Sequence, residues 1–180
     1  MKIKKCRNCK NNKLTKLFSL GKLSFTGKFP KNKNINIKKT KLALIMCPKC
    51  TLVQLDTNYD LKYLYGPDYG YRTGINKTMR DHMEGVKKIL LKKSKLRKGD
   101  HILDIASNDG TLLNFFNKNL RRVAIDPLVN KYKKFYKNIN YKISDFFSAK
   151  KILKKIPKGK FKIITALSVF YDINDPNFFF

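Results

Sequence analysis

The chain has few acidic residues and no long apolar run. No apolar stretch in its 180 residues approaches the roughly 20 that a membrane-spanning helix needs. The basic start, MKIKKCRNCK, lacks the apolar centre and the small-residue cleavage site of a secretory signal. We therefore predict a soluble, cytoplasmic protein without a membrane partner.

The shortage of acidic residues leaves a formal charge of +29, from 41 Lys and Arg against 12 Asp and Glu. Such an excess would normally indicate a polyanionic partner. Here it consists mostly of lysines spread along the whole chain, whereas nucleic-acid surfaces more often gather arginines and aromatic residues in one patch. The composition therefore does not favour a nucleic acid as the partner, and it indicates no oligomeric state.

The composition and the apolar pattern of the sequence change at two places along the chain, which predicts three parts. Residues 1–58 carry all four cysteines and only short apolar pieces, such as KLALIM and TLVQL, that suit small strands. Residues 59–98 begin rich in Tyr and Gly and continue into an amphipathic helix. The apolar residues at helical spacing there are Ile75, Met79, Met83, Val86 and Leu90.

Residues 99–180 alternate strand and helix patterns. The successive pieces are HILDIA, TLLNFFNKNL, RRVAID, PLVNKYKKFYKN, YKIS, FFSAKKILKKI and FKIITAL. Strands separated by helix-length segments predict βαβ units and a parallel sheet, the start of a doubly wound α/β domain.

The four cysteines form two pairs with the spacing of a zinc site. Cys6 and Cys9 enclose Arg-Asn, and Cys47 and Cys50 enclose Pro-Lys. Two such pairs can supply four tetrahedral thiolate ligands, in a closed site that would serve folding rather than catalysis. Disulfides, a redox-active pair and unrelated thiols are the alternatives. The expected cytoplasmic location disfavours structural disulfides, and neither pair begins a helix of a βαβ unit as a redox pair would. We predict structural zinc.

The turn after the first strand of the third part, ASNDG, has one glycine and follows a strand that contains an acid. In a doubly wound sheet, ligands bind at such a turn. A dinucleotide would require G-x-G-x-x-G, and acids beside a helix start would repel its pyrophosphate. The acids suit a cationic ligand such as S-adenosylmethionine. Asp126, after the second strand, would accept hydrogen bonds from ribose hydroxyls, and Asp145 follows the third strand, where methyltransferases commonly contact adenine.

The predicted cofactor-binding residues are Asp104, Ala106, Ser107, Asn108, Asp109, Gly110, Asp126, Pro127 and Asp145. Each acid has an alternative role as a capping or turn residue, and Asp109 in particular could cap a helix.

Several pieces of the sequence together resemble the NDP-sugar C-methyltransferases, which have an N-terminal zinc-binding domain, a class I methyltransferase domain and a C-terminal domain. The matching pieces, in family order, are CRNC, MCPKCTLVQL, YGYRTGINKTMRDHM, ILDIASNDGTLL, AIDP and SVFYDINDP. The resemblance implies the first half of a Rossmann-like class I methyltransferase fold, S-adenosyl-L-methionine as cofactor and a nucleotide-linked keto-deoxysugar as substrate. Ala106 and Thr51 stand where the family usually has glycine, and Ala106 would crowd the cofactor if its position requires a positive φ.

The implied reaction is methylation of a sugar carbon beside a ketone, after a base has removed the acidic proton. The resemblance implies that this base is a His in a Cys-His-Glu-His segment of the C-terminal region. Nothing in this chain matches that segment, so we expect the base beyond Phe180 and assign no catalytic residue. Substrate contacts are implied for Tyr69, Tyr71, Thr73 and His82, with packing between domains as the alternative. His101, at the start of its strand, is expected to be structural.

The sequence stops where a helix should cover the fourth strand. We therefore expect the N-terminal portion of a longer protein or a truncated product, inactive alone. Two other functions stay open. The charge would suit a zinc-containing RNA base methyltransferase, and a vestigial methyltransferase half would leave a non-catalytic, zinc-dependent interaction module.

Overall fold

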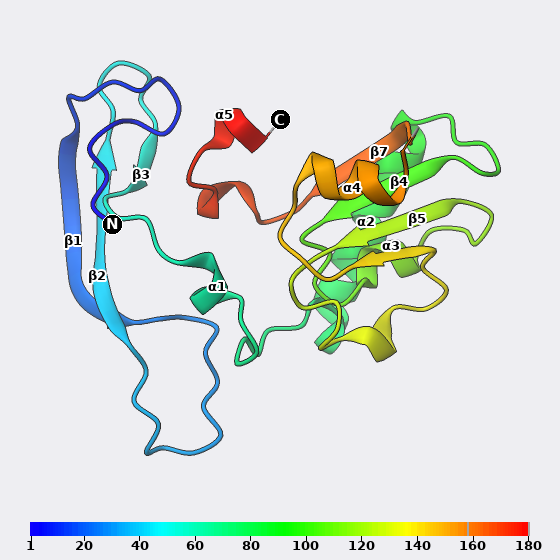
Figure 1. Cartoon of the computed structure of the whole chain (residues 1–180), viewed down its shortest axis with the longest axis horizontal. Coiled ribbons are helices and arrows are strands. Elements are labelled where there is room, and N and C mark those ends of the chain that lie inside the picture. Colours follow the sequence, from blue (N-terminus) through cyan, green and yellow to red (C-terminus); the bar gives the residue numbers. More distant parts are fainter. Residues whose placement is uncertain (158, 180) are drawn as a thin grey trace. The chain divides into compact units, whose positions relative to one another are not determined.

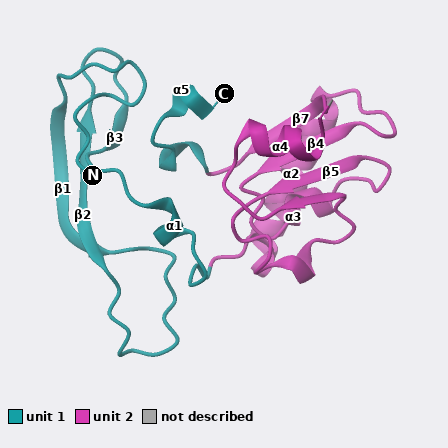
Figure 2. Ribbon diagram, in the orientation of Figure 1, with its two compact units in different colours: residues 1–70, 169–180 teal, residues 71–168 magenta. Residues whose placement is uncertain are grey.

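The computed structural model describes residues 1–157 and 159–179. It divides into two compact units, one of Met1–Gly70 with Val169–Phe180 and one of Tyr71–Ser168 (Figure 2). The predicted connector from 59 to 98 contributes residues to both units. Among the described helices, none has the length and apolar character needed to cross a membrane.

The first unit is built on a three-stranded antiparallel sheet in the order β1-β2-β3 (Figure 1). Its strands are β1 (Thr15–Ser24), β2 (Lys39–Met46) and β3 (Val53–Leu55). β2 and β3 lie in the predicted pieces KLALIM and TLVQL. β1 was not predicted, because all ten of its residues are exposed and no burial pattern marks it. Backbone pairing with β2 defines it instead.

Short helical pieces complete the first unit. They are α1 (Leu61–Leu64), the 3-10 turn η3 (Phe170–Asp172) and α5 (Pro176–Phe179). Asp60 caps the start of α1, because its side chain accepts a hydrogen bond from the backbone N of Lys62 at 2.9 Å. This bond satisfies an amide that the helix itself leaves without a partner.

The second unit contains a four-stranded parallel sheet in the order β6-β5-β4-β7. Its strands are β4 (His101–Ile105), β5 (Arg121–Ile125), β6 (Tyr141–Ile143) and β7 (Phe161–Ala166). In chain order this arrangement is 3-2-1-4, the first half of a doubly wound sheet. The predicted α/β class with a Rossmann-like half is confirmed. His101 packs edge-on against the ring of Phe161, 5.9 Å away, as expected of a structural residue.

Helices cover both faces of this sheet, with α2 (Lys77–Lys93) behind it and α4 (Ala149–Lys155) in front of it in Figure 1. The predicted amphipathic helix forms as α2, but Ile75, the first of its predicted apolar residues, lies before the helix and is 62% exposed. The helix follows the 3-10 turn η1 (Thr73–Ile75). Asn76 caps its start, because the Asn76 side chain accepts a hydrogen bond from the backbone N of Met79 at 2.8 Å.

The predicted helices after β4 and β5 are largely wrong. α3 covers only Thr111–Asn114, and after β5 only the 3-10 turn η2 (Lys133–Phe135) forms. The Asn114 side chain explains part of the difference, because it donates to Phe135 O at 2.8 Å and accepts from Lys137 N at 3.0 Å. Hydrogen bonds between the two segments thus override the helical spacing within each.

Candidate functional site

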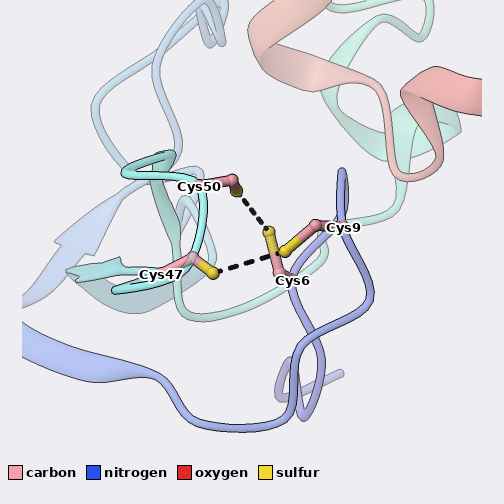
Figure 3. A group of neighbouring side chains, drawn as sticks. All are labelled: Cys6, Cys9, Cys47 and Cys50. Carbon is pink, nitrogen blue, oxygen red and sulfur yellow. Dashed lines mark hydrogen bonds between the residues drawn. The ribbon is translucent and has the colours of Figure 1, made fainter.

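The four cysteine side chains meet in the first unit (Figure 3). Their sulfur atoms all lie within 4.8 Å of one another, with 3.6 Å between Cys6 and Cys50 and 3.5 Å between Cys9 and Cys47. Four sulfurs that each lie about 2.3 Å from a tetrahedral zinc ion would be separated by about 3.8 Å, whereas a disulfide requires about 2.0 Å. All four thiols are free. The arrangement fits a metal site rather than disulfides.

Two turns of the same geometry present these sulfurs. In each, the residue after the second cysteine donates its backbone N–H to the carbonyl of the first, from Lys10 to Cys6 at 3.1 Å and from Thr51 to Cys47 at 2.8 Å. Both donors adopt left-handed backbone, with φ of 60° at Lys10 and 58° at Thr51. Thr51 therefore departs from glycine at a position whose conformation favours glycine.

Hydrogen-bond donors favour the thiolate at Cys47 and Cys50. At Cys9 the backbone N–H of Asn11 acts in the same direction, but burial and hydrogen bonds with the other three cysteines raise the pKa of the thiol to about 11. Burial alone would raise the pKa of the Cys47 thiol, but the side-chain amide of Asn11, 3.5 Å from Sγ, and nearby backbone N–H groups lower it to about 6. The backbone N–H of Leu52 lowers the pKa of Cys50. Because thiolates are the form that binds zinc, the residues present fit this metal, and four protein ligands leave no open position for catalysis.

The loop after β4, residues 106–111, bends through alternating left-handed residues. Its φ angles are 55° at Ala106, 51° at Asn108 and 75° at Gly110. A Cβ at Gly110 would lie 2.7 Å from the ring of Tyr136, so only glycine fits there. Ala106 N donates to Ile125 O at 2.8 Å, which ties the loop to the end of β5. Ala106 thus has the positive φ at which glycine is favoured.

Two buried carboxylates lie at the ends of β4 and β5. Asp104 accepts a hydrogen bond from Thr165 Oγ1 at 2.6 Å, and burial raises its pKa to about 7, with the charge of Asp126 adding to the rise. Asp126 accepts from the backbone N of Asn108 at 2.9 Å and of Leu128 at 2.7 Å. Burial nevertheless raises the pKa of Asp126 to about 6. The bond from Asn108 N joins this strand end to the loop.

Residues 71–75, which we call the strap, hold the same loop. Thr73 N donates to Asn108 Oδ1 at 2.8 Å, and Gly74 N donates to Asp109 Oδ2 at 3.0 Å. Asn108 Nδ2 donates to Tyr71 O at 3.3 Å. The segment expected to contact substrate therefore binds the predicted cofactor loop through its backbone.

Asp109 is only 1% exposed, and its carboxylate is engaged within the protein. Oδ1 accepts from the backbone N of Thr111 at 3.1 Å and from its hydroxyl at 2.6 Å, and Oδ2 lies 3.5 Å from Arg72 Nη1. The Arg72 guanidinium stacks on the Phe135 ring, 3.9 Å from its centroid. The bond from Thr111 N belongs to the turn before α3, whose N-cap is Gly110 and has no side-chain cap hydrogen bond, so Asp109 is a turn residue and not the predicted cap. A contact of Asp109 with a cofactor stays a prediction.

The other predicted site residues have separate environments. Ser107 Oγ lies 3.0 Å from the hydroxyl of Tyr136, within the loop region, and Pro127 directly follows Asp126. Asp145 pairs with Lys151 of α4 at 2.5 Å. His82 is exposed on α2, and Tyr69 belongs to the first unit, where its ring lies 5.1 Å from that of Tyr65.

Four further residues take part in these contacts without having been predicted from the sequence: Arg72, Gly74, Tyr136 and Thr165. The buried Tyr136 donates its hydroxyl to Asn108 O at 2.7 Å, but it lies in a segment whose lysine and tyrosine spacing predicted a helix. For Arg72 and Gly74 the only signal was their position inside YGYRTG. A Cβ at Gly74 would lie 2.5 Å from Thr111 Oγ1.

Comparison with known families supports the first unit's role. The family model Methyltransf_13, which describes a zinc binding domain, matches residues 6–65, a range that begins at Cys6 and includes all four cysteines. No curated protein matches the chain. The chain thus carries a methyltransferase-associated zinc-binding domain with a four-cysteine cluster, which points to a methyltransferase.

Proposed function

We propose that this chain provides the zinc-binding and cofactor-binding parts of an S-adenosylmethionine-dependent C-methyltransferase that acts on a nucleotide-linked keto-deoxysugar. One observation carries the proposal. A methyltransferase-associated zinc-binding domain is followed in the same chain by a parallel sheet of order 3-2-1-4, with carboxylates at the ends of its first two strands. Ligands of doubly wound sheets bind at this edge.

The chemistry of two buried carboxylates supports this cofactor. Asp104 and Asp126 are buried acceptors whose pKa values are raised to about 7 and about 6, so a ligand with positive charge or hydroxyl donors would stabilise their ionised forms. S-adenosylmethionine brings an ammonium, a sulfonium and two ribose hydroxyls. Asp126 would bind the ribose, and residues 106–110 the methionine part. When bound, the cofactor supplies an electrophilic methyl group.

The chain's own contribution would be to position the two reactants. The strap ties residues 71–75 to the loop 106–111, and Tyr71 remains 39% exposed, so its side chain can contact a substrate. Fixing a carbon nucleophile in line with a methyl donor removes much of the entropic barrier to transfer. The choice of a keto-deoxysugar as substrate rests on the resemblance of six sequence pieces, the first CRNC and the last SVFYDINDP, to the NDP-sugar C-methyltransferases.

Titration calorimetry of the chain with S-adenosylmethionine tests the cofactor. Binding is expected, and it should weaken roughly tenfold in Asp126→Asn, because one charge-assisted hydrogen bond contributes about 1.5 kcal/mol. Asp81→Asn, which removes an exposed carboxylate on α2, is the matched control and should bind like the wild type. Absence of heat with the wild-type chain would refute the cofactor assignment.

Transfer of a labelled methyl group by the complete gene product tests the substrate. Label is expected on a nucleotide-linked 4-keto-deoxysugar and not on RNA. Transfer to RNA, with binding that weakens steeply as salt rises, would replace the sugar by the RNA base that the charge of +29 favours. Cofactor binding without transfer to either class would contradict the proposed reaction.

A further inference from the structure

The chain that leaves β7 lies against the first pair of zinc ligands. We call Cys6–Lys10 the first knuckle and residues 170–178, which include η3 and most of α5, the docked segment. Asn177 Nδ2 donates to Asn8 O at 2.7 Å, Lys10 Nζ lies 3.1 Å from Asp175 Oδ1, and Arg7 Nη1 donates to Tyr171 O at 3.5 Å. The three contacts come from three different residues of the knuckle.

The charges of the two pieces are complementary. The docked segment holds two of the chain's 12 acidic residues, Asp172 and Asp175, whereas the knuckle presents Arg7 and Lys10. Asp172 also accepts a hydrogen bond from the hydroxyl of Tyr65. Exposed ion pairs contribute little one at a time, so the docking depends on several contacts made together.

Those contacts depend on the shape of the knuckle. Arg7 and Asn8 lie between the two cysteines, and Lys10 follows the second with a left-handed φ of 60°. A metal ion held by the four sulfurs would fix where the Asn8 carbonyl and the two cationic side chains point. Without it, the knuckle retains the hydrogen bonds from Lys10 N to Cys6 O, from Cys6 N to Asn11 O and from Arg7 N to Gln54 Oε1, but the four sulfurs lose their common ligand.

We propose that the first knuckle is a docking surface for residues 170–178 and that metal binding shapes this surface. The metal then does more than stabilise a small sheet. It holds residues 170–178, which begin a few residues after β7 ends at Ala166. The proposal rests on the metal site alone and needs no cofactor, so it stands or falls separately from the proposed reaction.

Hydrogen exchange of the zinc-loaded chain, read by mass spectrometry on peptides that cover 170–178, tests the docking. Amides in this segment are protected by bonds such as Asp172 N to Val169 O at 3.0 Å. In the double variant Arg7→Met, Lys10→Met their exchange should be roughly three- to tenfold faster, with one zinc per chain retained. Lys5→Met, which removes an exposed lysine just before Cys6, is the matched control and should leave the exchange unchanged.

A charge swap separates docking from misfolding. Lys10→Asp should accelerate exchange of residues 170–178, and adding Asp175→Lys should restore it. Metal removal, which should unfold the first unit, should accelerate exchange of residues 170–178 in the wild-type chain at least as much as the double variant does, while peptides of β4 and β5 stay protected. Unchanged exchange in the double variant, or no rescue by the swap, would overturn the docking surface. Loss of protection in the variants but not on metal removal would overturn the role of the metal.

Discussion

The two units of this molecule bury very different side chains. Among the described residues of the first unit, the buried ones are Cys6, Ala43, Ile45, Cys47, Gln54 and Asp56. Those of the second include Ile102, Leu103, Leu112, Leu113, Phe116, Val123 and Ile125. The strands show the same contrast, since all ten residues of β1 are exposed whereas four of the five in β5 are buried.

This difference indicates two sources of stability in one chain. Apolar burial is the main favourable term in folding, and the second unit has enough of it to form a core. Two aliphatic residues cannot supply the same term for the first unit, so the four sulfurs and their metal must make up the difference.

Metal removal should give the largest effect. A strong chelator, or Cys47→Ser, is expected to unfold the first unit, because a structural zinc ion contributes about 10–16 kcal/mol in small zinc domains. Hydrogen exchange should show β2 and β3 exchanging like an unfolded peptide while β4 and β5 stay protected. Protection of β2 that survives loss of the metal would show that the first unit folds without it.

The next largest difference between the units should come from truncating one leucine in each. Leu113 is 1% exposed and Leu20 of β1 is 58% exposed. Leu113→Ala should cost about 2–5 kcal/mol of unfolding free energy by leaving a cavity, whereas Leu20→Ala should stay within about 0.5 kcal/mol. Urea denaturation, followed by a probe in the unit that carries each change, measures both. Equal costs would contradict the contrast between the two cores.

The second unit should depend on pH through Asp104. Its pKa is about 7 in the folded chain against an ordinary 3.8, so the unfolded carboxyl ionises first as pH rises. The stability that this group contributes is therefore complete below pH 3.8, declines as pH rises and is lost above pH 7, with a slope of at most about 1.4 kcal/mol per pH unit.

Asp104→Asn should remove the part of the slope that Asp104 contributes and leave the part from Asp126, whose pKa burial raises to about 6. Urea denaturation between pH 4 and pH 7, with a probe in the second unit, should give a flatter profile for the variant than for the wild type. Asp81→Asn is the control, since this carboxylate is exposed on α2. A profile that stays as steep in Asp104→Asn would assign the pH dependence to other groups.

Glycine at two left-handed positions should give the smallest effect, with one position in each unit. Thr51→Gly and Ala106→Gly should each stabilise their unit by roughly 0.5–1 kcal/mol, because relief of left-handed strain exceeds the added entropy of the unfolded chain. Thr40→Gly in β2 should instead destabilise by about 1 kcal/mol. Thermal denaturation compares the three. A loss of stability at both positive-φ sites would contradict the strain argument.

Parts of the fold and site could be predicted because they depend on local patterns. Alternating strand and helix patterns predicted the parallel sheet, and helical spacing predicted α2. β1 left no such pattern because its side chains are exposed, so only its pairing with β2 reveals it. After β5 the local pattern predicted a helix that does not form. There the Tyr136 hydroxyl donates to Asn108 O in the loop 106–111, so a contact distant in sequence outweighs the local pattern.

The amino-acid sequence was enough to predict the metal ligands, because two cysteines separated by two residues lie in one turn of chain. It was also enough to predict the strands near whose ends Asp104 and Asp126 lie, because buried strands have a recognisable pattern of apolar residues. The contacts of the strap with the loop, and of residues 170–178 with the first knuckle, became apparent only in the folded chain. Those contacts use backbone groups and single side chains far apart along the chain, which leave no periodic pattern to read.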